Sequence, residues 1–132
     1  VALQIFNRVI IRFPNYALGW YNKGVTLHRN EMYSTIANNS ESENYTEVFK
    51  CYIEALKHDE NIAFAYFNVG QIYALQHKLD LAVKYWERVI ELEPNGLMTQ
   101  QLNSALKNMR IGVSNDVALA LLCNPVFVKH LI

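Results

Sequence analysis

The clearest hydrophobic pattern in the chain runs from Ala63 to Asn95 and predicts two amphipathic helices that lie antiparallel. Segment 77–80 breaks the pattern between them, and Asp80 is expected to cap the second helix. Pro94 is expected to end that helix, because the residue before a proline is disfavoured in the α region. The residues at helical spacing are Ala63, Tyr66, Val69, Gly70 and Tyr73 in the first helix and Ala82, Val83, Trp86, Val89 and Ile90 in the second.

This stretch resembles a tetratricopeptide repeat, whose unit of about 34 residues places an aromatic, Leu-Gly, Tyr, Ala, an aromatic, Ala and Pro in fixed order. Val89 replaces the second alanine, and Gly70 is expected where two helices pass close together. The resemblance implies an all-α solenoid of stacked antiparallel helix pairs, wound into a right-handed superhelix, and a binding scaffold. The matching places hold Tyr66, Val69-Gly70, Tyr73, Ala82, Trp86, Val89 and Pro94.

The segments before residue 63 repeat parts of the same pattern. Residues 1–15 align with the second helix, with Phe6 in the place of Trp86, so we expect a partial repeat that a preceding segment of a longer protein covers. Residues 17–61 align as a further repeat. In that repeat Gly24 precedes Gly70 by 46 residues but Val48 precedes Ala82 by 34, a difference of 12. The excess falls at 34–45, where we expect an exposed loop that either adds specificity or is a tolerated expansion.

The segments after Pro94 are expected to close the array. Residues 97–112 have an apolar helical face but lack the aromatic, Gly and Tyr of the pattern, which indicates a degenerate repeat or a capping helix ended by Gly112. Residues 113–132 are rich in apolar side chains and predict C-terminal helices. These helices either cap the core or fill the binding groove.

Composition narrows the class of protein. The chain has 132 residues, 52% of them hydrophobic, and a net charge of zero, which fits one domain and argues against nucleic-acid or membrane partners. The two cysteines, Cys51 and Cys123, form neither a disulfide framework nor a metal motif, so we expect reduced, buried thiols. We therefore expect an intracellular protein, in the cytoplasm, with no metal and no cofactor.

Catalytic residues are not indicated anywhere in the chain. The four histidines share no motif, and neither a phosphate-binding loop nor a nucleophile elbow occurs. His28 is expected to be a polar residue lining the groove. The prediction is therefore a protein that is not an enzyme.

The expected binding face follows from the resemblance, because the first helix of each repeat lines the concave surface in this family. An Asn on each first helix can hydrogen-bond the backbone of a peptide, while neighbouring aromatic residues form apolar pockets. The alternative is that the aromatic residues only pack between repeats. The expected partner-binding residues are Leu18, Tyr21, Asn22, Val25, Phe64, Phe67, Asn68 and Gln71.

Three functions are compatible with these residues. The first is a protein–protein interaction scaffold within a larger complex, which binds an apolar peptide or helix of a partner or of its own C-terminal segment. The second is a co-chaperone-type domain that binds an acidic C-terminal tail through a clamp of basic residues. Tyr21, Phe64 and Phe67 stand in or near the places of those basic residues, which argues against this function. The third is a regulatory domain of an enzyme that lies outside this sequence.

Overall fold

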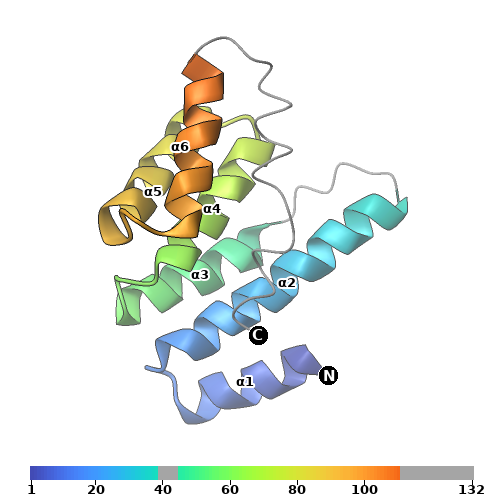
Figure 1. The fold of residues 1–132 in the computed structure, drawn as a ribbon. Coiled ribbons are helices and arrows are strands. Elements are labelled where there is room, and N and C mark those ends of the chain that lie inside the picture. Colours follow the sequence, from blue (N-terminus) through green and yellow to red (C-terminus); the bar gives the residue numbers. More distant parts are fainter. Residues whose placement is uncertain (39–44, 111–132) are drawn as a thin grey trace. The chain divides into compact units, whose positions relative to one another are not determined.

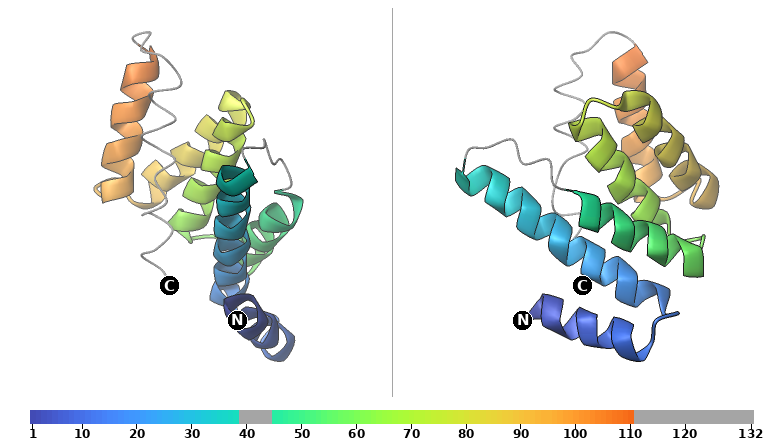
Figure 2. Two further views of the ribbon diagram at one scale, coloured as in Figure 1. Left: turned by 90° about the vertical axis from the view of Figure 1, so that its right-hand side faces the viewer. Right: turned by 180° about the vertical axis from the view of Figure 1, so that it is seen from behind.

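The chain folds into α-helices. The computed structural model describes residues 1–38 and 45–110, and within these ranges it contains six helices and no strand (Figures 1 and 2). The helical fold class and the pairing of adjacent helices are as predicted. The helices are α1 (Ala2–Arg12), α2 (Ala17–Asn38), α3 (Thr46–His58), α4 (Ala63–Leu75), α5 (Leu79–Leu92) and α6 (Leu97–Arg110).

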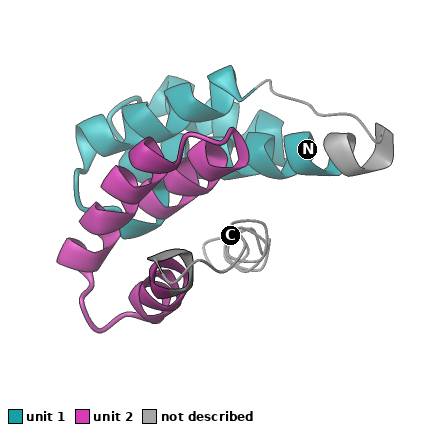
Figure 3. Cartoon of the chain, turned by 90° about the horizontal axis from the view of Figure 1, so that it is seen from above, with its two compact units in different colours: residues 1–65, 128–132 teal, residues 66–127 magenta. Residues whose placement is uncertain are grey.

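The described residues divide into two compact units, 1–65 and 66–110 (Figure 3). In the first unit α2 lies antiparallel to both α1 and α3 (Figure 1). Gly24 makes the close approach of α2 to α3, because a Cβ on this residue would lie 2.8 Å from Cε1 of Tyr52. The core of this unit is formed by side chains with almost no exposed surface, among them Tyr21, Val25, His28, Val48, Cys51 and Tyr52.

The second unit is built around Trp86. A Cβ on Gly70 would lie 2.2 Å from its Nε1, so the indole occupies the space that a side chain at residue 70 would need. The Trp86 Nε1–H donates a hydrogen bond to the backbone oxygen of Phe67, 3.2 Å away. The close approach predicted at Gly70 is therefore confirmed, and the aromatic ring of α5 is what fills it.

The turn between α4 and α5 differs from the prediction. His77 has a φ of 61°, and the N–H groups of His77 and Lys78 donate to the carbonyls of Ala74 and Tyr73. These two bonds form a Schellman motif, with His77 in the left-handed position usually held by glycine. Because this motif ends at Lys78, directly before α5, Lys78 is also the N-cap of α5. The prediction of Asp80 as the cap was therefore wrong, and Asp80 lies in the first turn.

The other helix ends agree more closely with the sequence. α5 ends at Leu92, two residues before Pro94, as predicted. The turn after α3 has no proline. Instead, the carboxylate of Asp59 accepts a hydrogen bond from the backbone N–H of Asn61, 3.0 Å away. A polar side chain thus stabilises this turn locally.

α2 is longer than expected, because it continues to Asn38 and spans 22 residues, compared with 13 for α4. Residues 34–38, which we expected to be part of a loop, are helical. Segment 34–38 contains neither Gly nor Pro, so nothing in it breaks the helix, even though it lacks the apolar spacing that we used to predict one. The expected C-cap Gly112 and the predicted helices in 113–132 lie outside the described residues, as do residues 39–44.

Candidate peptide-binding site

The first unit holds five of the residues predicted to bind a partner. α2 carries Leu18, Tyr21, Asn22 and Val25, and the start of α4 carries Phe64. Leu18 is 41% exposed, whereas Tyr21 and Val25 have no exposed surface. Asn22 and Phe64 are half-buried. A ligand that meets this unit without rearranging it can therefore contact Leu18, Asn22 and Phe64.

Tyr21 contributes to the packing of α2 on α3. Its ring centroid lies 5.7 Å from that of Tyr52, with the two planes tilted by 36°. Offset, tilted aromatic pairs at this distance add to the stability of a core beyond the area that they bury. The packing role that we considered for this residue is therefore present in the structure.

The second unit holds the other three predicted residues, all on α4. Phe67, Asn68 and Gln71 are 0%, 1% and 4% exposed. The carbonyl of Phe67 is the acceptor for the Trp86 indole. A role of these three residues in binding a partner stays a prediction.

Asn22 has an unusual environment among the polar residues of α2. Its backbone carbonyl accepts a hydrogen bond from the Thr26 hydroxyl, 3.0 Å away. Its side-chain oxygen Oδ1 is buried and has no hydrogen-bond partner among the described residues. A buried acceptor left without a donor costs roughly 1–3 kcal/mol. The side chain as a whole is half-buried.

His28 lies in the core and does not line a groove, so our expectation for this residue was wrong. It is 1% exposed, and its Nδ1 lies 3.0 Å from the hydroxyl of Tyr52. The ring of Tyr45 meets the imidazole nearly edge-on, at 5.8 Å and 88°. Desolvation by burial lowers the pKa of His28 to about 4, so the ring is neutral at pH 7. The helical period of α2 turns this residue toward α3, which alignment to groove positions alone did not reveal.

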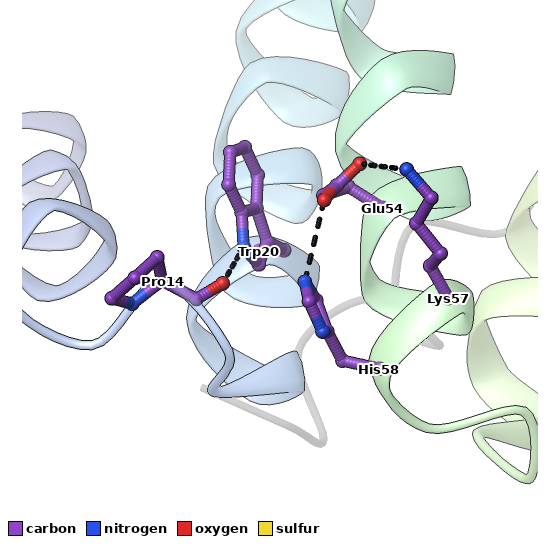
Figure 4. Close-up of polar contacts among 5 residues, drawn as sticks. All are labelled: Pro14, Trp20, Glu54, Lys57 and His58. Carbon is purple, nitrogen blue, oxygen red and sulfur yellow. Dashed lines mark hydrogen bonds and ion pairs between the residues drawn. The ribbon is translucent and has the colours of Figure 1, made fainter.

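A pocket of about 610 Å³ lies on the surface of α2 and α3 and was not predicted. Its apolar lining comes from Trp20, Phe49 and Ile53, and Ile53 is 46% exposed. Trp20 also donates a hydrogen bond from its indole N–H to the Pro14 carbonyl, 2.8 Å away (Figure 4). The apolar residues Phe49 and Ile53, which lie four positions apart on α3, were the signal that could have revealed it.

Three charged residues, Glu47, Lys50 and Glu54, also line this pocket. The carboxylate of Glu54 lies 3.5 Å from Nζ of Lys57 and 3.3 Å from Nε2 of His58 (Figure 4). Glu47, at the other end, lies 3.7 Å from Nζ of Lys23. Ion pairs at such partly exposed positions contribute little to stability.

The described residues contain no group of three or more His, Cys, Asp or Glu side chains arranged to hold a metal ion. Cys51 is a free, buried thiol. Burial raises its pKa to about 11, and the Lys23 charge opposes this effect only in part. None of the six described helices has the length and hydropathy of a membrane-spanning segment.

Comparison with known proteins identifies one segment. Residues 63–95 match the family model of the tetratricopeptide repeat, over the same stretch that carries Gly70, Trp86 and Pro94. Neither the search of curated proteins nor the search of solved structures found a match.

Proposed function

Because residues 63–95 are a tetratricopeptide repeat, we propose that this chain is a non-catalytic interaction module that binds an apolar peptide or helix of a partner protein. Members of this family are typically protein-binding domains. The proposed contact residues are the eight on α2 and α4 named above. Leu18, Asn22 and Phe64 meet the ligand first, because they retain exposed surface.

The observation that carries this proposal is the unpartnered Oδ1 of Asn22. A peptide backbone supplies N–H donors at regular intervals, and one of them can satisfy this acceptor. Leu18, one turn before Asn22 on α2, and Phe64 at the start of α4 supply exposed apolar surface for side chains of a ligand. The unpartnered oxygen costs free energy in the free protein, so a hydrogen bond from the ligand to this oxygen contributes favourably to the free energy of binding.

The ligand belongs to a partner subunit in a larger assembly or to the chain's own segment 113–132. Segment 113–132 lies outside the described residues. Both sources have the same chemistry, namely aliphatic side chains on a backbone that donates hydrogen bonds. The experiment therefore includes an arm for each source.

The test compares Asn22→Ala with Asn30→Ala in affinity purification of the full-length protein, followed by mass spectrometry. Asn30 is a matched control because it is an exposed Asn on the same helix. We expect one partner to be lost with Asn22→Ala and kept with Asn30→Ala. A synthetic peptide from that partner should then bind the Asn22→Ala protein about tenfold more weakly.

The second arm titrates a synthetic peptide of residues 113–132 into a protein truncated after residue 112. Binding that Asn22→Ala weakens assigns the ligand to the chain itself. Equal binding of every peptide by the Asn22→Ala and Asn30→Ala proteins contradicts the proposal. So does an unchanged set of partners together with no binding of the 113–132 peptide.

A further inference from the structure

The pocket on α2 and α3 lies where the second unit has an aromatic ring. The offsets of 46 residues from α2 to α4 and of 34 residues from α3 to α5 make Trp20 the counterpart of Tyr66 and Cys51 that of Tyr85. In the second unit the centre of the Tyr85 ring lies 6.2 Å from that of Tyr66 and 5.5 Å from that of Tyr73. In the first unit both counterparts, Trp20 and Cys51, line the pocket. The small side chain of Cys51 therefore leaves open the space that a ring fills in the other repeat.

The rest of the lining is more apolar than the matching positions of the second unit. Phe49 and Ile53 stand in the places of Val83 and Glu87. Phe49 is half-buried, and Ile53 is 46% exposed. An aliphatic side chain thus replaces a charged one next to the open space. Apolar surface of this kind gains free energy when an apolar group covers it.

The exposure of this side is a property of the repeat and not of the residue at which the sequence begins. The lining residues all lie on α2 and α3, and α1 precedes both helices. Lys84 and Glu87 of the second unit are exposed although α1–α3 precede them in the chain. These two residues are the counterparts of Lys50 and Ile53 in the pocket. Both repeats therefore leave the same side of their second helix open.

Lys50 is the one charged residue of the lining that has no ion pair with residues 1–38 and 45–110. Glu47 lies 3.7 Å from Nζ of Lys23. Glu54 pairs with two side chains in the last turn of α3. A positively charged ligand would find both carboxylates engaged, whereas a carboxylate of a ligand can pair with Lys50. Charge complementarity thus favours an acidic group beside the apolar one.

We propose that this pocket binds an aromatic side chain of a partner protein that is flanked by an acidic residue. The ring enters the space beside Trp20 that Tyr85 fills in the second unit, and the carboxylate pairs with Nζ of Lys50. An offset or edge-to-face contact with the Trp20 indole favours an aromatic ring over an aliphatic side chain. Aromatic side chains that enter a pocket of the partner carry much of the binding energy of protein interfaces.

This pocket is distinct from the proposed groove. Trp20 lies two residues from both Leu18 and Asn22 on α2, a rotation of roughly 200° about the helix axis. Phe64 lies on α4, which contributes no residue to the lining of the pocket. Ligand binding in the pocket should therefore not change in the Asn22→Ala protein, so that failure of one proposal can be told from failure of the other.

The probes for the test are three labelled synthetic peptides with blocked ends. The first has the order Gly-Glu-Phe-Glu-Gly, the second has Ala in place of Phe, and the third has Lys in place of both Glu residues. Fluorescence anisotropy measures the binding of each peptide to the intact chain of 132 residues. NMR spectra of the two indole N–H groups then locate the first peptide. The signal of Trp20 should shift, whereas that of Trp86, which is buried in the second unit, should not.

Three protein variants change the pocket, and a fourth is the matched control. Cys51→Tyr supplies the missing ring, and Ile53→Glu introduces the residue that the second unit has at this place. We expect each to bind the first peptide at least about tenfold more weakly. Lys50→Glu should weaken binding at least about threefold, and Lys84→Glu, the same change at the counterpart on α5, should leave it unchanged. Circular dichroism verifies folding, and because Lys50 and Ile53 are exposed, their variants keep the test valid if Cys51→Tyr does not fold.

Several results would overturn the proposal. These are no binding of the first peptide, equal binding of the Ala or the Lys peptide, or binding that no folded pocket variant weakens. A shift of the Trp86 signal without one of Trp20, or loss of binding with Asn22→Ala, would place the peptide elsewhere. Binding that appears only in a protein truncated after residue 112 would assign the pocket to the chain's own segment 113–132. Self-association that Ile53→Glu abolishes, without binding of any peptide, would assign it to a second copy of the chain.

Discussion

The imidazole Nδ1 of His28 lies 3.0 Å from the Tyr52 hydroxyl, inside the core between α2 and α3. The rings of Tyr45 and Tyr52 face the imidazole edge-on. Neither tyrosine carries a charge that could stabilise an imidazolium, and desolvation is what lowers the pKa of His28. The fold therefore holds this histidine neutral.

The stability of the first unit should consequently fall in mild acid. The pKa of His28 is about 4 in the folded chain and 6.5 in the unfolded chain, so the unfolded state binds the extra proton between these values. The free energy of unfolding keeps its full value above pH 6.5. It declines as the pH falls below 6.5 and is about 3 kcal/mol lower near pH 4. Urea unfolding of the native protein and of His28→Gln at several pH values measures this loss. An equal pH dependence for the two proteins would contradict it.

Replacing Gly70 by Ala should destabilise the second unit. The new Cβ would lie 2.2 Å from Nε1 of Trp86, so the indole must move and lose its hydrogen bond to Phe67. We expect a loss of roughly 2–4 kcal/mol, the size of other core disruptions. An ordinary Gly→Ala change inside a helix gains up to about 1 kcal/mol, so the sign of the effect is diagnostic.

Ser104→Ala, at an exposed position of α6, is the control for the Gly70 variant. It should change stability by no more than about 0.5 kcal/mol. Thermal unfolding followed by circular dichroism, together with tryptophan fluorescence, measures both variants. A Gly70→Ala protein as stable as the native one, with unchanged fluorescence, would show that the Trp86 packing does not require glycine.

Replacing Asn22 by Ala should raise stability, even though it weakens ligand binding. The change removes a buried acceptor that has no described partner and introduces a better helix former. Asn30→Ala improves helix propensity alone, so the excess gain of Asn22→Ala, about 1 kcal/mol, measures the cost of the unpartnered oxygen. Urea unfolding of the three proteins gives these values. A gain no larger than that of Asn30→Ala would mean that Oδ1 has a partner in solution.

Cys51 should react slowly in the folded protein. A pKa raised to about 11 leaves little thiolate at pH 8, about a hundredfold less than at the ordinary value, and the side chain is 1% exposed. Iodoacetamide labelling of a Cys123→Ser variant follows Cys51 alone. Labelling should become fast only in denaturant, and fast labelling without denaturant would contradict the burial of this thiol.

The sequence predicted most of the helices, because their apolar spacing and the glycines at residues 24 and 70 specify pairs that pack closely. It missed the end of α2, because residues 34–38 have no apolar stripe from which a helix could be predicted. It also misplaced the cap of α5, because a histidine adopts the left-handed position that sequence rules reserve for glycine or asparagine.

The candidate site could be predicted only in part. Alignment to a repeat assigns a residue to a position along the helix but does not report how far that residue is covered. Leu18 and Val25 were both proposed as surface for a ligand, yet one is 41% exposed and the other is fully buried. The unpartnered oxygen of Asn22 is likewise invisible in sequence, since it depends on which donors lie within reach.

The contacts that join α2 to α3 have a consequence for the connectivity of the chain. These contacts pair Gly24 with Tyr52, Lys23 with Glu47, and His28 with Tyr45, the N-cap of α3. None of these three contacts involves segment 39–44. The two helices are therefore held by side chains rather than by the peptide link that joins them. A protein cleaved within 39–44 should remain a stable two-fragment complex. If each fragment is fused to one half of a split reporter enzyme, association of the two fragments would restore the activity of that enzyme.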